Sequence, residues 1–355
     1  MNEQFELFRE GDDLYDDMLA AIRSARDSVC LESYIFGADE LGDAFVEALC
    51  DCATRGCRVR VSIDAIGSLG FAVSDGPEQL LNAGVELNWF NPPRFVSLQR
   101  LNRRNHRKLL VVDGEQAWLG GFNIHSECSR RLHGDGRWRD TQVRFGGQLA
   151  RHAQQFFENI WAGNRRQVVV EPESSESIII SNHNWRQRHR YRRNLLNAVR
   201  QSQQRVWLTT PYFMPDRPTQ LVMAAAAQRG VDVRLLVPYK TDRPMTQWAA
   251  RAAYANLLAA GVRIFEYQPR LLHAKTALVD ESWCTVGTAN LDYRSFYVNF
   301  EMNLVSANFP LIKSLADDFR QDLEDAEEII ETRWSRRSIA MRVAEVIGWF
   351  ARRYL

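Results

Sequence analysis

The chain contains the same pattern of chemistry-bearing residues twice. Residues 106–123 read HRKLLVVDGEQAWLGGFN and residues 273–290 read HAKTALVDESWCTVGTAN, and both fit H-x-K-x4-D-x6-G-[G/T]-x-N without an insertion. Histidine can act as a nucleophile or an acid, lysine supplies positive charge, and asparagine supplies neutral hydrogen-bond donors. Two copies at matched spacing suit one anionic phosphodiester, if each copy contributes half of a shared pocket.

The chemistry of a phosphodiester explains why each residue type is needed. Its anionic oxygens repel nucleophiles, and its alkoxide leaving group needs a proton. The lysines would offset the charge and the asparagines would donate to the phosphate oxygens, namely Lys108, Lys275, Asn123 and Asn290. One neutral imidazole can attack phosphorus to form a phosphohistidine while a protonated imidazole gives its proton to the departing oxygen. This scheme divides the work between His106 and His273, and it requires no divalent metal or other cofactor.

Four acidic residues complete the candidate catalytic set. Asp113 and Asp280 belong to the motifs, but alternation along a strand turns them away from histidine and lysine, so we expect them to shape turns. An imidazole nucleophile also needs its second ring nitrogen held, usually by a carboxylate. Asp140 in WRDTQVRF and Glu301 in VNFEMNLV are the candidates for that task. The alternative is that each is an ordinary acid of an edge strand.

The duplication extends to the elements that must position the motifs. The aligned segments are 14–36 with 194–213, 48–64 with 222–238, and 80–92 with 257–269. These segments read as helices followed by short strands rich in Val, Ile and Leu, and Arg55-Gly56 and Arg229-Gly230 mark matching helix ends. The alternation predicts an α/β fold in which two similar mixed sheets, with helices on their faces, pack together.

The halves differ directly ahead of their histidines. Pro92 and His106 are fourteen positions apart, whereas Pro269 and His273 are four apart, so the first half carries an insertion of ten (14 − 4). The segment 90–108 has six Arg or Lys residues, no acid, and interleaved Phe and Leu. It is either a loop that contacts substrate or a solvated surface loop.

Composition excludes some classes of protein. With 355 residues and 45% hydrophobic content, the chain can form one large globular domain or two. Its 45 basic and 44 acidic residues nearly cancel, so an anionic partner must be bound locally. The six cysteines lack paired zinc-ligand spacing and are expected to be reduced core thiols; a metal site at Cys50, Cys52 and Cys57 is the alternative.

The ends of the chain bear on location and domain boundaries. The acidic start lacks an apolar run, and no stretch reaches the roughly 18–20 apolar residues of a spanning helix. We therefore expect a cytoplasmic protein that associates peripherally with the inner (cell) membrane. The predicted units are residues 1–170, 171–333 and a basic amphipathic tail at 334–355. That tail is either an interfacial helix on anionic lipid or a helix docked on the protein itself.

These motifs resemble the phospholipase D superfamily, whose signature is the doubled H-x-K-x4-D followed by G-S/T/G-x-N. The resemblance covers almost the whole chain. Segment 273–304 and the opening FELFREGDDLYDDMLAAI look most like bacterial cardiolipin synthases of the short type that lack N-terminal transmembrane helices. The resemblance implies a bilobal fold with a pseudo-twofold axis through an active site between the halves. It also implies transfer of a phosphatidyl group to the hydroxyl of phosphatidylglycerol.

The resemblance also implies roles for the paired residues. His106 matches the usual nucleophile and His273 the usual acid, which later acts as base. A crossed arrangement is implied, in which the carboxylate of one half orients the histidine of the other. Glu301 would then serve His106, and Asp140 would serve His273.

Substrate binding involves a second group of candidates. Gly121 stands where many members carry Ser or Thr, whereas Thr288 keeps the hydroxyl in the second half. Arg100, Arg103 and Arg104 of the inserted segment are the other candidates for contact with substrate phosphate. A phospholipase D-type hydrolase uses the same six motif residues, because water can replace the lipid hydroxyl as acceptor.

Two further classes remain as alternatives. A nucleic-acid phosphodiesterase would need a basic groove with stacking aromatics, and the near-neutral charge counts against it. A non-catalytic lipid-binding protein would not need both motifs filled. The expected partners are therefore an anionic phospholipid substrate and a peripheral membrane surface, with no nucleic acid and no obligate protein partner.

Overall fold

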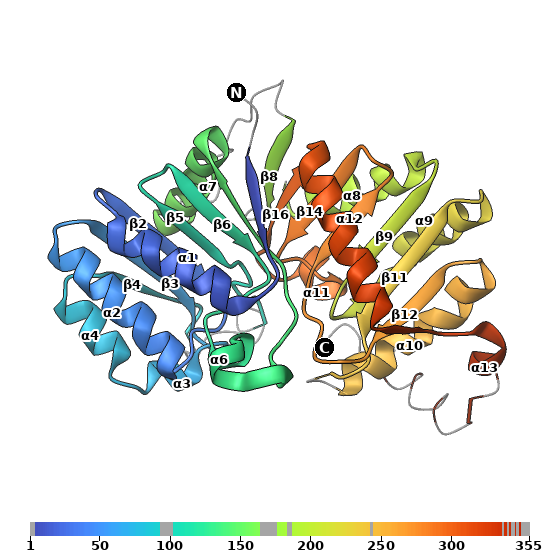
Figure 1. Cartoon of the computed structure of the whole chain (residues 1–355), viewed down its shortest axis with the longest axis horizontal. Helices are drawn as coiled ribbons and strands as arrows, with labels where there is room; N and C mark the ends of the chain where they lie inside the picture. Colours follow the sequence, from blue (N-terminus) through green and yellow to red (C-terminus); the bar gives the residue numbers. More distant parts are fainter. Residues whose placement is uncertain are drawn as a thin grey trace.

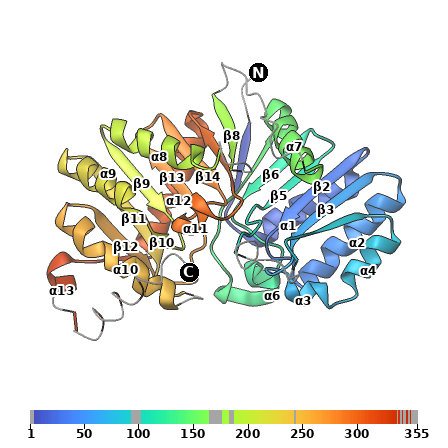
Figure 2. The same cartoon turned by 180° about the vertical axis from the view of Figure 1, so that it is seen from behind.

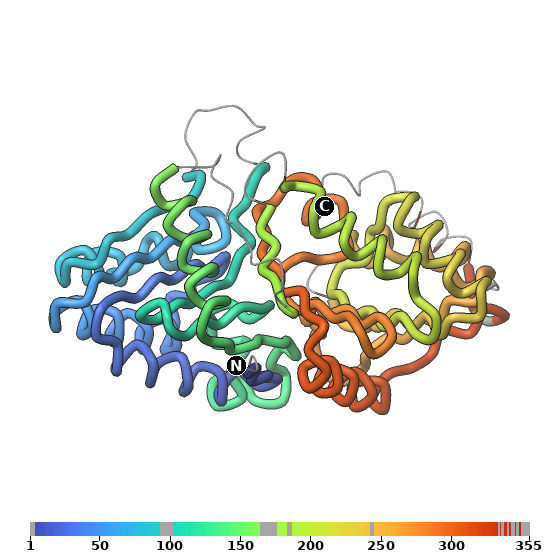
Figure 3. The backbone as a smooth tube through the Cα atoms, turned by 90° about the horizontal axis from the view of Figure 1, so that it is seen from above, coloured from blue at the N-terminus to red at the C-terminus, as the bar shows by residue number. Residues whose placement is uncertain are grey.

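In the computed structural model the chain folds into two α/β halves that lie side by side (Figure 1, Figure 3). The structure describes residues 4–92, 102–163, 176–182, 187–241 and 244–335, and the positions 337, 338, 341, 345 and 348. Each half is a mixed sheet with helices on its faces, as Figure 2 shows from behind. The predicted fold class is confirmed.

The first half contains a seven-stranded sheet in the order β1-β7-β6-β5-β2-β3-β4. Its strands are β1 (Phe5–Phe8), β2 (Ser28–Ser33), β3 (Arg58–Asp64), β4 (Glu86–Phe90), β5 (Leu109–Val112), β6 (Gln116–Gly120) and β7 (Gln142–Gly146). Its helices are α1 (Gly11–Ser24), α2 (Glu40–Thr54), α3 (Leu69–Ala72), α4 (Gly76–Asn82), α6 (Arg130–His133) and α7 (Gly147–Trp161). Strands β2, β3 and β4 are parallel, and the remaining pairs are antiparallel.

The second half contains an eight-stranded sheet in the order β17-β12-β11-β9-β13-β14-β16-β8. Its strands are β8 (Ser177–Ser181), β9 (Arg205–Thr209), β11 (Asp232–Pro238), β12 (Arg263–Tyr267), β13 (Thr276–Val279), β14 (Trp283–Gly287), β16 (Met302–Ser306) and β17 (Ala326–Glu328). Two short strands, β10 (Phe213–Met214) and β15 (Leu291–Asp292), pair separately. Its helices are α8 (Arg190–Gln201), α9 (Arg217–Gln228), α10 (Pro244–Ala259), α11 (Tyr293–Tyr297), α12 (Phe309–Glu324) and α13 (Glu331–Ser335).

The two sheets repeat one plan. Read from β4 to β1 and from β12 to β8, the strand orders correspond one to one, and β17 adds an edge strand to the second sheet only. The predicted helix ends also match, because Gly56 and Gly230 both adopt positive φ values, 97° and 89°, one residue beyond the C-caps of α2 and α9. Only a residue without Cβ adopts such a conformation at little cost.

One apolar core joins the halves. It includes buried residues of β5, β6, β7 and α7 together with residues of β13, β14, β16 and α12. Helix α7 also contacts β8 of the second sheet, and α12 contacts β1 of the first. Burial of this shared surface fixes the two sheets relative to each other, and with them the two motifs.

Both motifs lie at the same edge of their sheets. Strand β5 runs antiparallel to β2, with Leu109 opposite Glu32, so residues 106–108 lie at the carboxyl ends of the parallel strands. Strand β13 bears the same relation to β9, with Thr276 opposite Thr209. This edge is where α/β sheets usually bind ligands.

The six cysteines are free, and all but the half-buried Cys50 are buried, as expected for core thiols. Among the described residues, no group of three or more His, Cys, Asp or Glu side chains is arranged to hold a metal ion. None of the helices in the described ranges is both long and apolar enough to cross a bilayer.

Few residues of the predicted tail are described; of these, Glu345 and Gly348 are buried, whereas Met341 is exposed. Glu345 is buried and forms an ion pair with Arg337, at 2.7 Å. Gly348 lies against α10, where an added Cβ would come within 2.6 Å of the Ala249 nitrogen. The ion pair lies within the tail, and the Gly348 contact favours the docked alternative at that position. The rest of the tail, and the predicted boundary at 170/171, lie outside the described residues.

Candidate active site

Each histidine is approached by a segment of the other half. The amide of Phe300 donates to the carbonyl of Arg104, and the amide of His106 donates back to the carbonyl of Phe300, both at 2.9 Å. A matching pair of bonds joins Arg139 to residues 271 and 273, at 2.8 and 2.7 Å. Glu301 directly follows Phe300, and Asp140 directly follows Arg139. These two parallel bridges therefore bring the carboxylate of each half to the imidazole of the other half.

The ring nitrogen Nδ1 of His106 lies between two acceptors. It is 3.0 Å from Oε2 of Glu301 and 3.1 Å from the carbonyl oxygen of Thr288. Neither oxygen can donate a proton when the carboxylate is ionised, so the hydrogen must lie on Nδ1. The other ring nitrogen, Nε2, then carries the lone pair that a nucleophile needs.

The environment keeps His106 neutral. Burial, together with Lys108 and Lys275, lowers its pKa to about 4 against the opposing effect of Glu301. The ring packs edge-on against Tyr34, with the ring centroids 5.1 Å apart.

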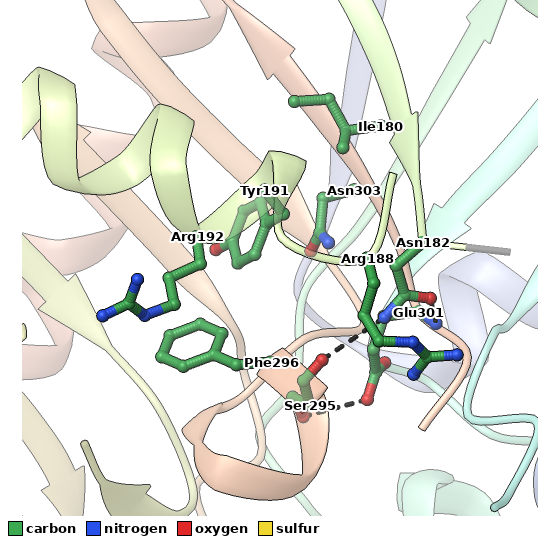
Figure 4. A pocket seen from close by; sticks show the side chains of 9 residues that line it. All are labelled: Ile180, Asn182, Arg188, Tyr191, Arg192, Ser295, Phe296, Glu301 and Asn303. Carbon is green, nitrogen blue, oxygen red and sulfur yellow. Dashed lines mark hydrogen bonds between the residues drawn. The ribbon is translucent and has the colours of Figure 1, made fainter. Parts of the chain in front are cut away.

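Glu301 is held by donors of its own half. Its Oε2 accepts from the Thr288 hydroxyl at 2.5 Å and its Oε1 from Ser295 at 2.9 Å, while its backbone amide donates to Asn182 at 2.7 Å. Figure 4 shows Asn182 and Ser295 beside Glu301 in a pocket that Arg188 also lines. Burial opposes ionisation of Glu301, but His106, Thr288 and Lys108 together lower its pKa.

His273 has a different pair of neighbours. Its Nδ1 lies 2.5 Å from Oδ2 of Asp140 and 2.8 Å from the Lys275 ammonium. The other Asp140 oxygen accepts from the Thr141 amide at 2.8 Å. Burial and Lys275 lower the pKa of His273 to about 3, and Asp140 opposes them. The ring packs against Trp138, with centroids 5.0 Å apart.

The missing hydroxyl at Gly121 has a steric reason. A Cβ at this position would come within 2.0 Å of Oδ1 of Asp140. Gly121 therefore leaves room for a short carboxylate that is drawn close to the strand, whereas Thr288 supports the longer Glu301 in the second half. Thr288 was predicted to bind substrate, but its hydroxyl is occupied by Glu301 and by the Met302 amide. Its position makes it a support for the carboxylate.

The two lysines lie in one electrostatic neighbourhood. Lys108 donates to the carbonyl of its own motif histidine at 2.8 Å, and Lys275 makes the corresponding bond to His273. Burial and the nearby Lys275 lower the pKa of Lys108 to about 7. Each lysine also lowers the pKa of the histidine in the other motif. Two lysines whose positive charges disfavour each other in this way form a site for an anion.

The motif asparagines are also buried at the site. Oδ1 of Asn123 accepts from the Ile35 amide at 3.1 Å, which orients its amide group. The backbone amide of Asn290 donates to Ser295, and its Oδ1 has no hydrogen-bond partner among the described residues. The side-chain N–H groups of both can donate to a non-bridging oxygen.

The motif aspartates serve the fold. Asp113 accepts from the backbone amides of residues 26–28 at 2.8–3.0 Å, and Asp280 accepts from those of residues 203–205 at 2.8–3.3 Å. Both adopt a positive φ of 52° at the turn after β5 or β13. Their inclusion among catalytic candidates is corrected: they fasten the turn to the start of the neighbouring strand, as the alternation of side chains predicted.

The arginine predictions have mixed outcomes. Arg104 was predicted to contact substrate, but its guanidinium is buried and binds Asp64 at 3.2 Å, so it supports the segment that leads to His106. Arg103 is exposed at the start of that segment, and its contact with substrate stays a prediction. Arg100 lies outside the described residues.

Several supporting residues were not predicted from the sequence. They are Tyr34, Trp138, Asn182, Arg188 and Ser295. Their types are common at surfaces and in cores, and none is repeated in both halves, so neither spacing nor duplication identified them.

Comparison with known proteins agrees with the geometry. The sequence pattern of a family described as "Cardiolipin synthase, PLD-like domain" matches residues 18–161 and 195–323. Cardiolipin synthase 2 of Bacillus anthracis is 33% identical over 94% of this chain and 67% of its own length. A cardiolipin synthase of Geobacillus kaustophilus is 33% identical over 97% of this chain and 71% of its own length.

Solved structures share the fold. The phosphatidylserine synthase of Haemophilus influenzae superposes with a TM-score of 0.75 over 98% of this chain and 93% of its own, at 14% identity. A polyphosphate kinase of Porphyromonas gingivalis superposes with a TM-score of 0.65 over 99% of this chain and 53% of its own, at 15% identity. At such low identities the likeness concerns the arrangement of the two halves and not the reaction.

Proposed function

Because this chain belongs to the cardiolipin synthase family with phospholipase D-like domains, and is therefore a phosphatidyltransferase, we propose that it moves a phosphatidyl group between two phosphatidylglycerol molecules. The group is carried on His106 as a phosphohistidine. The products are the lipid with two phosphatidyl groups and free glycerol.

One observation supports this division of labour above the others. His106 has two acceptors around Nδ1, whereas His273 has one carboxylate and one lysine there. The first environment fixes a neutral ring with a free lone pair on Nε2. In the second, the Asp140 carboxylate can accept the Nδ1 hydrogen of an imidazolium whose other hydrogen is on Nε2, where an acid must carry it.

In the first step, Nε2 of His106 attacks the phosphorus of one phosphatidylglycerol. The N–P bond forms, the P–O bond to the glycerol head group breaks, and the departing oxygen takes the proton from Nε2 of His273. The bound phosphodiester is an anion, so it raises the proton affinity of His273 relative to the empty site. Glycerol leaves, and His273 is left neutral.

In the second step, neutral His273 acts as a base. It takes the proton from a hydroxyl of the second phosphatidylglycerol, whose oxygen attacks phosphorus. The new P–O bond forms, the N–P bond breaks, and His106 returns to its neutral form. Lys108, Lys275 and the two asparagines stabilise the additional negative charge on the non-bridging oxygens in both steps.

A vesicle assay tests this proposal. The chain is incubated with phosphatidylglycerol vesicles, and the lipid and water-soluble products are separated. Equal amounts of cardiolipin and glycerol are the expected result. Phosphatidic acid in place of cardiolipin would assign the site to hydrolysis, and inertness toward lipid together with cleavage of single-stranded DNA would assign it to nucleic acid.

A further inference from the structure

The exposed apolar side chains of this protein are not spread evenly. Of the twelve large hydrophobic residues that are exposed among the described positions, six come from two short segments, after β3 and after β11. They are Ile66, Leu69 and Val73 in the first half, and Tyr239, Met245 and Trp248 in the second. Scattered exposed hydrophobics are common, but a gathering in two equivalent segments is not.

The two segments are structural equivalents. Strands β3 and β11 occupy the same place in the two sheets, next to β2 and β9. Each apolar segment therefore leaves the carboxyl end of the same strand, at the edge where both histidines lie. Figure 1 shows α3, α6 and α10 along this one edge, and α6 adds the exposed Leu132.

Hydrogen bonds connect the first segment to the site. Asp64 accepts from the amides of Ile66 and Gly67 at 3.0 and 3.1 Å, and the same carboxylate accepts from the amide of Asn105 at 2.8 Å. Asn105 directly precedes His106. The Ser68 hydroxyl donates to the carbonyl of Tyr34 at 3.0 Å.

The second segment is connected in a similar way. The amide of Tyr239 donates to the carbonyl of Tyr267 at 3.0 Å, and the Lys240 ammonium donates to the carbonyl of Pro269 at 2.6 Å. Pro269 lies four positions before His273. These hydrogen bonds fix the first residues of both apolar segments beside the strand ends that present the imidazoles.

The imidazoles themselves are deep in the protein, with His106 8% and His273 5% exposed. A lipid phosphodiester can reach them only if its acyl chains remain in an apolar environment while the head group enters the site. Apolar side chains on both sides of this sheet edge provide that environment, because they replace water at the surface of the bilayer. Tyr and Trp suit this position, since their rings place an apolar body in lipid and a polar group at the head-group level.

Resting on the proposed function, we infer that these two segments form the membrane-docking face of the enzyme. The occupant is the surface of a phospholipid bilayer. Ile66, Leu69 and Val73 enter it on one side of the site and Tyr239, Met245 and Trp248 on the other, so that the site opens directly onto the lipid head groups. Exposed Arg103 and Lys240 at the same edge favour bilayers that contain anionic lipid.

The test compares two kinds of exposed apolar side chain. Leu69→Glu/Val73→Glu and Tyr239→Glu/Met245→Glu place charge on the docking face. Leu81→Glu/Leu221→Glu is the matched control, because these leucines are 57% and 58% exposed, like Leu69 at 55%, but lie on α4 and α9. All six substitutions are at exposed positions outside the catalytic residues.

Binding is measured by sedimentation with vesicles of phosphatidylglycerol and phosphatidylcholine. Each docking-face pair should lower the ratio of bound to free protein at least about tenfold, and the control pair should leave it unchanged. The inference is overturned if wild type does not bind the vesicles. It is also overturned if the control pair loses as much binding as the docking-face pairs, or if Met341→Glu in the tail is the change that abolishes binding.

Turnover on two forms of substrate separates this inference from the proposed function. On dihexanoyl phosphatidylglycerol below its micelle concentration, the docking-face variants should retain the wild-type rate, which also shows that they are folded. On vesicles their rate should fall with their binding. If wild type binds vesicles through this face but makes no cardiolipin from either substrate, the docking face stands and the proposed reaction fails.

Discussion

The two imidazole sites are copies in sequence but are supported by different neighbours. Glu301, the partner of His106, accepts from two hydroxyl donors, Thr288 and Ser295. Asp140, beside His273, instead accepts from a backbone amide and lies 3.8 Å from the Lys275 ammonium. A duplicated motif therefore fixes which residues meet, and the surrounding residues determine the protonation state of each imidazole. This difference lets two histidines of one pattern take the opposite roles that the reaction needs.

The segments that carry the two carboxylates are also anchored differently. Arg139, next to Asp140, makes a bidentate ion pair with Asp322 of α12, at 2.9 and 3.0 Å. On the other side, the segment around His106 is fixed by Asp64 and by the buried pair of Arg107 with Glu32, at 3.0 Å. The position of Arg107 is occupied by alanine in the second motif, so this anchor is not duplicated.

The largest expected difference between the two sites is in the first chemical step. His106→Ala should abolish both turnover and labelling of the protein by a phosphatidyl donor, because the nucleophile is gone. His273→Ala should still form a slow labelled intermediate when the donor has a p-nitrophenyl leaving group, which needs no proton; acid assistance is worth about 10²–10⁴-fold. Trapping with radiolabelled donor measures both. Equal labelling of the two variants would contradict the assignment.

Removing the charge of each carboxylate sharpens the same comparison. Glu301→Gln removes the negative charge beside Nδ1 of His106, which stabilises the positive ring of the phosphohistidine, so labelling should slow by about 10²-fold with either leaving group. Asp140→Asn should slow turnover of phosphatidylglycerol to a similar extent but restore most of the rate with the p-nitrophenyl donor. Single-turnover kinetics distinguish the two, and identical leaving-group dependence would show that the imidazoles are interchangeable.

The Arg139 anchor should matter for stability. Arg139→Met leaves the buried Asp322 with Arg9 alone, and loss of one partner of a buried pair costs about 3–5 kcal/mol in free energy of unfolding. Urea unfolding measures this cost. Lys313→Met, which removes an exposed partner of Asp317, is the control and should leave the midpoint unchanged. A small change in the free energy of unfolding on Arg139→Met would show that the contact with Arg9 is enough to compensate the charge of Asp322.

The next comparison concerns the paired positions 121 and 288. Gly121→Ala forces the Asp140 carboxylate away from its place, because the new Cβ meets Oδ1 at 2.0 Å. Thr288→Val keeps the shape of the side chain but removes the hydroxyl that donates to Glu301 and accepts from the Met302 amide. We expect Thr288→Val to lower kcat about tenfold, as the loss of the buried hydrogen bond to Glu301, worth about 1–1.5 kcal/mol, predicts, and Gly121→Ala to lower it further. Steady-state kinetics test which of the two variants has the lower kcat. Gly120, the neighbour of Gly121 on β6, cannot serve as a control position, because a Cβ added there would meet backbone atoms.

The features found from the sequence are those that duplication exposed. Two aligned halves predicted two mixed sheets, matching helix ends, and the residues of the site, and the geometry brings His106 to Glu301 and His273 to Asp140. What the sequence could not reveal depends on contacts that occur once. Arg104 resembled a phosphate ligand in a basic segment, but its partner Asp64 is forty positions away and became visible only in the fold.

The smallest expected effect is on the pH dependence of stability. Burial lowers the pKa of His106 to about 4 and that of His273 to about 3, whereas an unfolded chain has histidine pKa values near 6.5. The unfolded state therefore takes up protons first as pH falls, so the stability that these residues contribute is complete above about pH 6.5 and declines from there toward pH 4. His106→Gln/His273→Gln should lose less stability than wild type between pH 7 and pH 5.

Urea midpoints at the two pH values provide the measurement, and His133→Gln serves as the control because that side chain is exposed on α6. If the double variant keeps the wild-type pH dependence, other groups must account for it. His106→Gln and His273→Gln are also measured separately. If only one of them reduces the pH dependence of stability, the two imidazoles differ in proton affinity in the empty site. The two halves would then differ in the free energy of protonating each imidazole as well as in the residues that surround it.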